Sequence, residues 1–256
     1  MNPLLPAAGL VVAGIAGTFW YRRRAGKLEH ALDVASHQLE HLQNAFHRFA
    51  PQEVVEDIIR KGVSVRGERR EVTVMFADLV GFTALSERTE PEALVQILNG
   101  YFEAMSRAIT ANRGHVSKFI GDGILALFGA PDPNPWQAID GVAAAVAMRT
   151  ALAAYNETLA GKGLPPLGIG IGLHIGPVIA GVVGSHDLIE YTVIGDTVNT
   201  AARIESLTRK AGTSVLISDA VKQRLDGRWN LRECEPMAVK GKTEPVLTWA
   251  VEATVA

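Results

Sequence analysis

The sequence predicts an α+β domain over residues 71–252, preceded by a transmembrane helix and a coiled-coil helix. Within residues 71–252, short strand-like runs alternate with helical patterns, as in folds that combine both kinds of element. An uncharged segment and a heptad pattern precede that region. At about 185 residues, the C-terminal region is long enough to bury a single hydrophobic core.

Residues 4–21 carry no charged side chain and are followed at once by Arg22, Arg23 and Arg24. As an α-helix they span roughly 27 Å, close to the hydrocarbon thickness of a bilayer. We therefore expect a single-pass helix in the cell membrane, in contact with lipid, with the C-terminal region facing the cytoplasm. A buried or interfacial helix is the alternative, because Pro6 and the glycines weaken the span.

Residues 25–49 predict a coiled-coil signalling helix, because apolar residues recur at alternating spacings of four and three. A helix that packs on its own domain would show the same stripe, so that alternative stays open. A short helical pattern and a charged connector follow, and residues 50–70 are the expected coupling segment. The heptad positions are Leu28, Leu32, Ala35, Leu39, Leu42, Phe46 and Phe49.

The C-terminal region divides into short elements. Its periodicity predicts helices over residues 91–112, 136–160 and 197–210. Strands are expected over residues 71–79, 115–120, 123–129, 168–182, 189–194 and 214–218.

Two aspartates lie where an apolar, strand-like run ends at a glycine-containing turn. Asp78 belongs to Phe76-Ala-Asp-Leu-Val-Gly-Phe-Thr83, and Asp122 belongs to Lys118-Phe-Ile-Gly-Asp-Gly-Ile124. For either residue alone, a turn former or helix cap is the usual explanation. Together, the two carboxylates can hold divalent metal, and their hard oxygen ligands favour Mg²⁺ or Mn²⁺.

A third segment, from Tyr191 to Glu205, predicts a strand, a Gly-Asp turn and a helix that begins near Thr197. Asn199 and Arg203 are four residues apart in that helix and therefore share one face. This face combines a neutral hydrogen-bonding group with a permanent cation.

These segments together resemble the class III nucleotidyl cyclases, the family of adenylyl and guanylyl cyclase catalytic domains, over roughly residues 68–252. The resemblance implies a ferredoxin-like β-α-β-β-α-β core, with the Gly-Asp-Gly sequence around Asp122 at a hairpin turn. It implies that two divalent cations are bound at Asp78, Leu79 and Asp122. It also implies that Asn199 and Arg203 act on the ribose and on the reacting phosphate.

The implied reaction converts ATP to 3′,5′-cyclic AMP and pyrophosphate. The ribose 3′-hydroxyl attacks the α-phosphorus in line, so negative charge grows at both ends of the reaction axis. One cation can lower the pKa of the attacking hydroxyl while the second bridges phosphate oxygens. The guanidinium of Arg203 can stabilise the charge on the five-coordinate phosphorus.

The loop after Asp78 is expected to bind the β- and γ-phosphates. Gly81 lets the main-chain N–H groups of the loop, including that of Phe82, come close to phosphate, and the Thr83 hydroxyl adds a donor. An ordinary strand-to-helix connection is the alternative for Gly-Phe-Thr alone. By the resemblance, Lys240 in Val239-Lys-Gly-Lys-Thr-Glu-Pro245 reaches the terminal phosphates of the nucleotide.

Base choice falls, by the same resemblance, to Lys118 and Thr192. Lys118 can donate to adenine N1 and Thr192 can accept from the N6 amine, whereas guanine presents the opposite polarity on that edge. ATP is therefore the expected substrate. Many adenylyl cyclases have Asp where this chain has Thr192, which resembles the subgroup that includes bicarbonate-responsive enzymes. Bicarbonate is accordingly a candidate effector.

Active sites in this family form between two catalytic domains, one supplying the metal aspartates and the other the groups that bind base, ribose and phosphate. Because this chain carries both sets, we expect a homodimer with two equivalent sites. A guanylyl or relaxed-specificity cyclase and a catalytically silent, dimerising nucleotide-sensing module are the alternatives. Lys118 argues against the former, and the intact Asp78, Asp122, Asn199 and Arg203 argue against the latter.

The composition excludes several other classes. A formal net charge of −2 gives no basic field for binding nucleic acid, so no nucleic-acid partner is expected. Cys234 is the only cysteine in the sequence, which excludes an internal disulfide and a cysteine-based zinc site.

Overall fold

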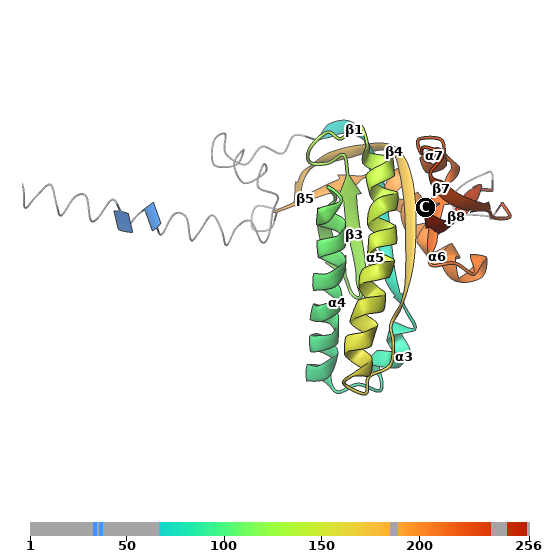
Figure 1. Ribbon diagram of the computed structural model, residues 1–256. Helices are drawn as coiled ribbons and strands as arrows, with labels where there is room; N and C mark the ends of the chain where they lie inside the picture. The colour runs from blue at the N-terminus through green and yellow to red at the C-terminus, as the bar shows by residue number, and fades with distance from the viewer. Residues whose placement is uncertain (1–32, 35, 38–66, 185–188, 237–244, 255–256) are drawn as a thin grey trace, which may run out of the picture. The chain divides into compact units, whose positions relative to one another are not determined.

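The computed structural model describes residues 33–34, 36–37, 67–184, 189–236 and 245–254 (Figure 1). The chain divides into two units, Met1–Arg60 and Lys61–Ala256. In the first unit the four described residues are helical. The predicted transmembrane helix lies outside the described residues, as do nearly all of the predicted coiled coil and coupling segment.

The second unit is built on an eight-stranded sheet with the order β2-β3-β1-β4-β6-β8-β7, to which β5 is added by pairing with β4. The first four strands in this order are antiparallel neighbours. Chain order and strand order together give the β-α-β-β-α-β arrangement that the sequence predicts. The strands are β1 (Glu68–Val80), β2 (His115–Ile120), β3 (Gly123–Phe128), β4 (Gly168–Gly184), β5 (Ile189–Ile194), β6 (Val215–Ser218), β7 (Trp229–Glu233) and β8 (Thr248–Thr254).

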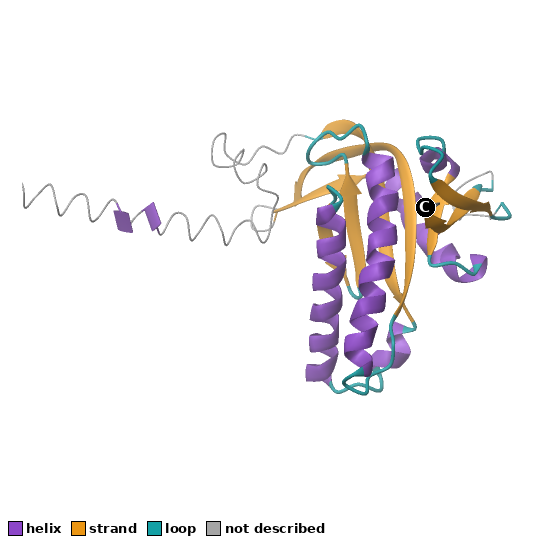
Figure 2. Ribbon diagram, in the orientation of Figure 1, coloured by secondary structure: helices purple, strands orange, loops and turns teal. Residues whose placement is uncertain are grey.

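Two long helices lie side by side over one face of the sheet, as Figures 1 and 2 show. They are α4 (Pro91–Ala111), which begins with a proline in its first turn, and α5 (Gln137–Ala160). On the opposite face, α6 (Asp196–Ala211) packs along β4. Two short helices, α3 (Phe82–Ser86) and α7 (Asp219–Lys222), complete the described part of the domain.

β1 lies at the centre of the fold because both of its faces are covered. Met75, Ala77 and Leu79 belong to the core formed with α4 and α5. Val72 and Val74, which point to the other face, belong to a second buried cluster that includes Ala201 of α6. The alternation of side chains along a strand produces this division. The rigid strand that results ends next to Asp78.

Glycines on β4 allow α6 to approach the sheet closely. At Gly172, a Cβ atom would lie 2.1 Å from the main-chain nitrogen of Glu205 and 2.7 Å from the carbonyl oxygen of Ala201. The helix is also fastened at its first turn, where the Thr197 hydroxyl donates to the carbonyl oxygen of Pro177 at 2.7 Å. The position of α6 is therefore set by direct backbone packing against β4.

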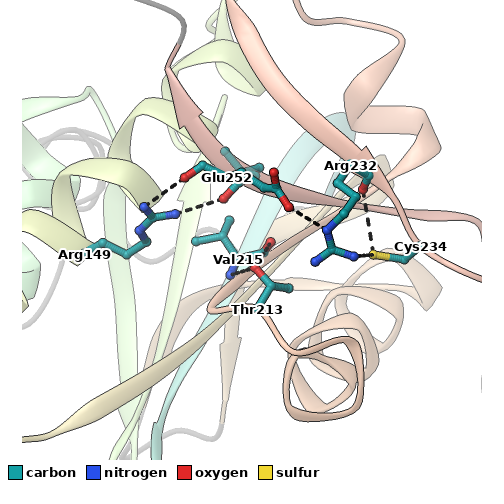
Figure 3. Close-up of polar contacts among 7 residues, drawn as sticks. Arg149, Thr213, Val215, Arg232, Cys234 and Glu252 are labelled. Atoms are coloured by element: carbon teal, nitrogen blue, oxygen red, sulfur yellow. Dashed lines mark hydrogen bonds and ion pairs between the residues drawn. The ribbon is translucent and has the colours of Figure 1, made fainter.

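The C-terminal strand is tied to α5 and to its neighbour β7 by arginines (Figure 3). Arg149 of α5 donates to the carbonyl oxygens of Val251 and Glu252, at 2.9 and 3.1 Å. Arg232 of β7 donates to the Glu252 carboxylate at 2.5 Å and also contacts the Cys234 sulfur. These contacts fix the edge of the sheet farthest from β2.

The predicted elements agree with the structure, with a few differences. β1 begins at Glu68, three residues before the predicted strand, because its first residues pair with the far end of β4 at Ala180. The sequence did not predict α3, α7, β7 or β8. Among the described residues, α5 alone is long and apolar enough to cross a membrane, but it belongs to the core of the domain.

Candidate active site

Asp78 and Asp122 come together at one end of β1. Asp78 pairs with Gly170 of β4, and the turn between β2 and β3 places Asp122 nearby. A Cβ atom at Gly123 would lie 3.3 Å from Asp78 Oδ1, so the Asp78 carboxylate lies directly beside this turn. The turn is made by Gly121, whose φ of 63° favours glycine. Two carboxylates from separate motifs thus face the same space.

The two carboxylates influence one another. The pKa of Asp78 is raised, first by burial, then by the charge of Asp122 and by a hydrogen bond with Asp122. Arg209 and the main-chain N–H of Leu79 act in the opposite direction. A divalent cation bound here would stabilise the charged form of Asp78, because its positive charge offsets the negative charge of the neighbouring carboxylate.

The residues present therefore fit a divalent cation. The donor set consists of hard carboxylate oxygens, which suits Mg²⁺ or Mn²⁺. Over the part of the chain that the structure describes, no group of three or more His, Cys, Asp and Glu side chains is arranged to hold a metal ion. The fit thus rests on the two aspartates, together with oxygen ligands other than His, Cys, Asp and Glu side chains.

The loop after Asp78 turns through Gly81, which has φ 77° and ψ 20°. A Cβ atom there would meet no other atom within 4 Å, so the loop faces open space. The first turn of α3, which begins at Phe82, has no side-chain cap. Its main-chain N–H groups are thus available to an anion. Phe82 packs against the main core, whereas Thr83 is exposed.

Lys118 on β2 is held by an ion pair with Glu190 on β5. Glu190 lies two residues before Thr192 and therefore on the same face of β5. The Ser117 hydroxyl also donates to the carbonyl oxygen of Tyr191, at 3.5 Å, and so links the two strands. The structure thus brings the two residues that are predicted to select the base into one region.

Asn199 and Arg203 lie on the outer face of α6. The sheet-facing residues of this helix are buried and include Ala201, Ile204 and Glu205. Asn199 is exposed and Arg203 is half-buried. Among the described residues, no hydrogen bond or ion pair joins either side chain to Asp78 or Asp122.

A third acidic residue, Glu205, lies behind the aspartates on the inner face of α6. It is buried, and its Oε1 atom has no hydrogen-bond partner. A Cβ atom at Gly170, the residue opposite Asp78, would lie 2.6 Å from that oxygen. Burial raises the pKa of Glu205 to about 7, with a further contribution from Asp78. Burial and the same carboxylates also raise the pKa of Tyr101.

Three charged neighbours in this region were not predicted from the sequence. Glu190 contacts Lys118, Glu205 lies behind Asp78, and Arg209 at the end of α6 lies 3.6 Å from the Asp78 carboxylate. Glu190 could have been found from the sequence, because it lies two residues before Thr192 in a predicted strand and so shares its face. The others depend on how α6 meets the sheet. Lys240 lies outside the described residues.

The fold and the paired aspartates define a class III nucleotidyl cyclase domain. The family model described as the adenylate and guanylate cyclase catalytic domain matches residues 65–253. The chain therefore belongs to the adenylate and guanylate cyclase catalytic domain family, as the sequence motifs predict.

Some similar proteins are named adenylate cyclases and others are named guanylyl cyclases. The chain is 36% identical over 238 residues to an adenylate cyclase of Anabaena cylindrica; the match covers 89% of this chain and 46% of that protein. This chain thus spans about half the length of that relative. Among solved structures, the guanylyl cyclase Cya2 matches with a TM-score of 0.68 and 39% identity, covering 73% of this chain and 94% of Cya2. The adenylyl cyclase CyaB from P. aeruginosa matches with a TM-score of 0.69 and 32% identity, covering 74% and 97%.

Proposed function

We propose that the protein is an adenylyl cyclase that converts ATP to 3′,5′-cyclic AMP and pyrophosphate at the interface of a homodimer. The observation that carries the proposal is the pair of facing carboxylates, Asp78 and Asp122, at the end of the central strand. Divalent cations held there would lower the pKa of the attacking 3′-hydroxyl and neutralise charge on the phosphates. Family membership supports the same reaction class.

The remaining roles follow from where the side chains lie. The Gly81–Thr83 loop, adjacent to Asp78, is placed to bind the β- and γ-phosphates of the same nucleotide. Arg203 of the second protomer would stabilise the charge that develops on the α-phosphorus, and Asn199 would orient the ribose. Replacing Arg203 should therefore lower kcat more than it raises KM.

A site shared by two copies is supported by the absence, in the described part of the chain, of any hydrogen bond or ion pair between Asn199 or Arg203 and the two aspartates. Asn199 and Arg203 lie on the face of α6 that is turned away from the sheet, whereas Asp78 belongs to strand β1 of the sheet. Large apolar side chains are exposed next to both halves, as a protein–protein interface would require. Phe119 and Ile120 adjoin Asp122, and Ile179, Val183 and Ile194 lie on the β4–β5 arm that carries Thr192.

Lys118 favours ATP over GTP. Its ammonium group can only donate hydrogen bonds, and adenine N1 is an acceptor, whereas guanine N1 carries a hydrogen. Glu190, the ion-pair partner of Lys118, lies two residues before Thr192 on β5, and the Thr192 hydroxyl can accept from the adenine N6 amine. A guanylyl cyclase is the second candidate, since Cya2 shares 39% of its aligned residues with this chain.

The first experiment is cyclic-nucleotide formation by the full chain, given ATP or GTP with Mg²⁺ or Mn²⁺. Cyclic AMP formation that is lost in Asp78→Ala supports the proposal. Cyclic GMP formation from GTP supports the second candidate, and the absence of any product points to a catalytically silent nucleotide-sensing module.

A mixing experiment tests the shared site. Asp78→Ala and Arg203→Ala should each be inactive alone, because every site in either homodimer lacks one group. When equal amounts are allowed to exchange subunits, random pairing leaves about a quarter of the sites intact. Activity should therefore reappear at about a quarter of the wild-type level. Its failure to reappear would contradict a site shared between protomers.

Regulation by bicarbonate is a further part of the proposal and rests on Thr192 alone. We expect bicarbonate to raise the rate of cyclic AMP formation at fixed pH. A flat response across the titration removes this effector.

A further inference from the structure

Arg209 forms an ion pair with one of the two aspartates of the candidate site. It belongs to the last turn of α6, and its Nη2 atom lies 3.6 Å from Asp78 Oδ2. Both side chains are partly exposed, Arg209 by 51% and Asp78 by 38%. Glu205 lies four residues earlier, on the adjacent position of the same helix. Arg209 thus adjoins Asp78 and Glu205 from within the same chain.

The local charge is unbalanced without Arg209. Asp78, Asp122 and Glu205 form an acidic group, and the charge of Arg209 lowers the pKa of both Asp78 and Glu205. In the described ranges, Arg209 is the one basic side chain with an ion pair to any of these three carboxylates. It therefore supplies positive charge at the place where a divalent cation would supply it.

We infer that Arg209 is an internal counter-ion of the two-aspartate site, which pairs with Asp78 when no cation is bound and yields it when a cation enters with the nucleotide. This inference rests on the proposed function of the aspartates. A partly exposed ion pair is weak and opens readily, as an exchangeable partner must. A free divalent cation must displace Arg209 against its positive charge. A cation that arrives with a triphosphate brings negative oxygens, with which the released guanidinium can pair instead.

The test compares the binding of free Mn²⁺ with the binding of Mn²⁺ and 3′-deoxy-ATP, which lacks the attacking hydroxyl. Free Mn²⁺ is measured by electron paramagnetic resonance with the full 256-residue chain. Arg209→Gln should tighten the binding of free Mn²⁺ by about two- to fivefold, the magnitude expected for a partly exposed ion pair. The same variant should bind Mn²⁺·3′-deoxy-ATP about two- to fivefold more weakly, because the triphosphate loses a cationic partner.

Two variants serve as controls. Lys210→Gln removes the same charge from the next residue, which is exposed, and should change either affinity by less than half as much. Arg209→Lys keeps the charge and should restore both affinities toward the wild-type values. A residue with only a structural role would not shift the two affinities in opposite directions.

The outcomes separate this inference from the proposed function. If the wild-type chain binds Mn²⁺ and Asp78→Asn does not, the metal site stands. Unchanged Mn²⁺ affinity in Arg209→Gln, or an equal shift in Lys210→Gln, then overturns the role of Arg209 alone. If the wild-type chain binds no Mn²⁺ with or without 3′-deoxy-ATP, the metal site and the role of Arg209 both fail.

Discussion

A single ion pair positions Lys118, the residue that is predicted to recognise adenine. Its partner, Glu190, comes from a different strand, and both side chains are partly exposed. We predict that Glu190→Gln lowers the preference for ATP over GTP by about two- to fivefold, because Lys118 then loses the ion pair that restrains its side chain. The measurement is kcat/KM for the two nucleotides under the same metal conditions.

Glu157→Gln is a suitable control for that variant, because it removes a carboxylate from an exposed position on α5. Its nucleotide preference should match that of the wild type. An unchanged preference in Glu190→Gln as well would show that the ion pair has no part in base selection.

Glu205 should make the stability of the metal-free domain depend on pH. Its pKa is about 7 in the folded chain, against an ordinary value of 4.5. The unfolded chain therefore loses this proton first as the pH rises. Stability from the protonated Glu205 is full below about pH 4.5 and is lost as the pH rises through 7. Glu205→Gln, which stays neutral, should therefore be more stable than the wild type at pH 8, by about 1–3 kcal/mol.

Thermal unfolding with a chelator present, at pH 5 and pH 8, measures this effect. The two proteins should differ little at pH 5, where the folded wild-type Glu205 is protonated, and most at pH 8. A difference of equal size at both pH values would mean that the amide acts through packing and not through charge.

The candidate site residues that the sequence could predict are those that belong to a short, recognisable pattern along the chain. Asp78 and Asp122 each lie at a strand end beside a glycine turn, and Asn199 and Arg203 have the spacing of one helical face. Arg209 and Glu205 also belong to that helix, but their relation to Asp78 arises only when α6 packs against β4. No spacing within the chain encodes that relation.

At the scale of secondary-structure elements, β4 and α6 pack closely where Gly172 faces the backbone of the helix. We predict that Gly172→Ala lowers the free energy of unfolding by about 1–3 kcal/mol, because its Cβ would overlap the backbone of α6 at Glu205. Chemical denaturation measures the change.

Gly161→Ala is the matched control for this substitution. Gly161 has φ −61°, and its Cβ would have its nearest contact at 3.6 Å, an ordinary van der Waals distance. Its stability should be unchanged or rise by up to about 1 kcal/mol. Equal effects of the two substitutions would contradict close packing at Gly172.

The long helices and most strands were predictable from the sequence, but the two strands nearest the C-terminus were not. α4 and α5 show sustained helical patterns, and the strands at 115–120, 123–128 and 189–194 are bounded by glycine or charged turns. β7 and β8 pair with each other across an intervening segment of the chain, and Arg232, Glu233 and Glu252 break their apolar pattern. Such strands are stabilised by distant partners, which their own composition does not reveal.

At the scale of the whole molecule, the sequence of the N-terminal segment predicts that the protein is anchored in a membrane. We expect the full chain to stay in the membrane pellet after an alkaline carbonate wash, because residues 4–21 would cross the bilayer. A chain that starts at residue 25 should move to the supernatant. Release of the full chain would instead favour the interfacial helix that the proline and glycines of this segment allow.

The outward orientation of Asn199 and Arg203 also bears on how the protein could be controlled. Under the proposed arrangement, an isolated chain makes no product at any substrate level. While most chains are single, output rises with the square of their number in a given area. Any event that gathers chains into one patch of membrane would then act as a switch, even if no chain changes its shape. The rate of product formation would then depend on the local surface density of the protein itself.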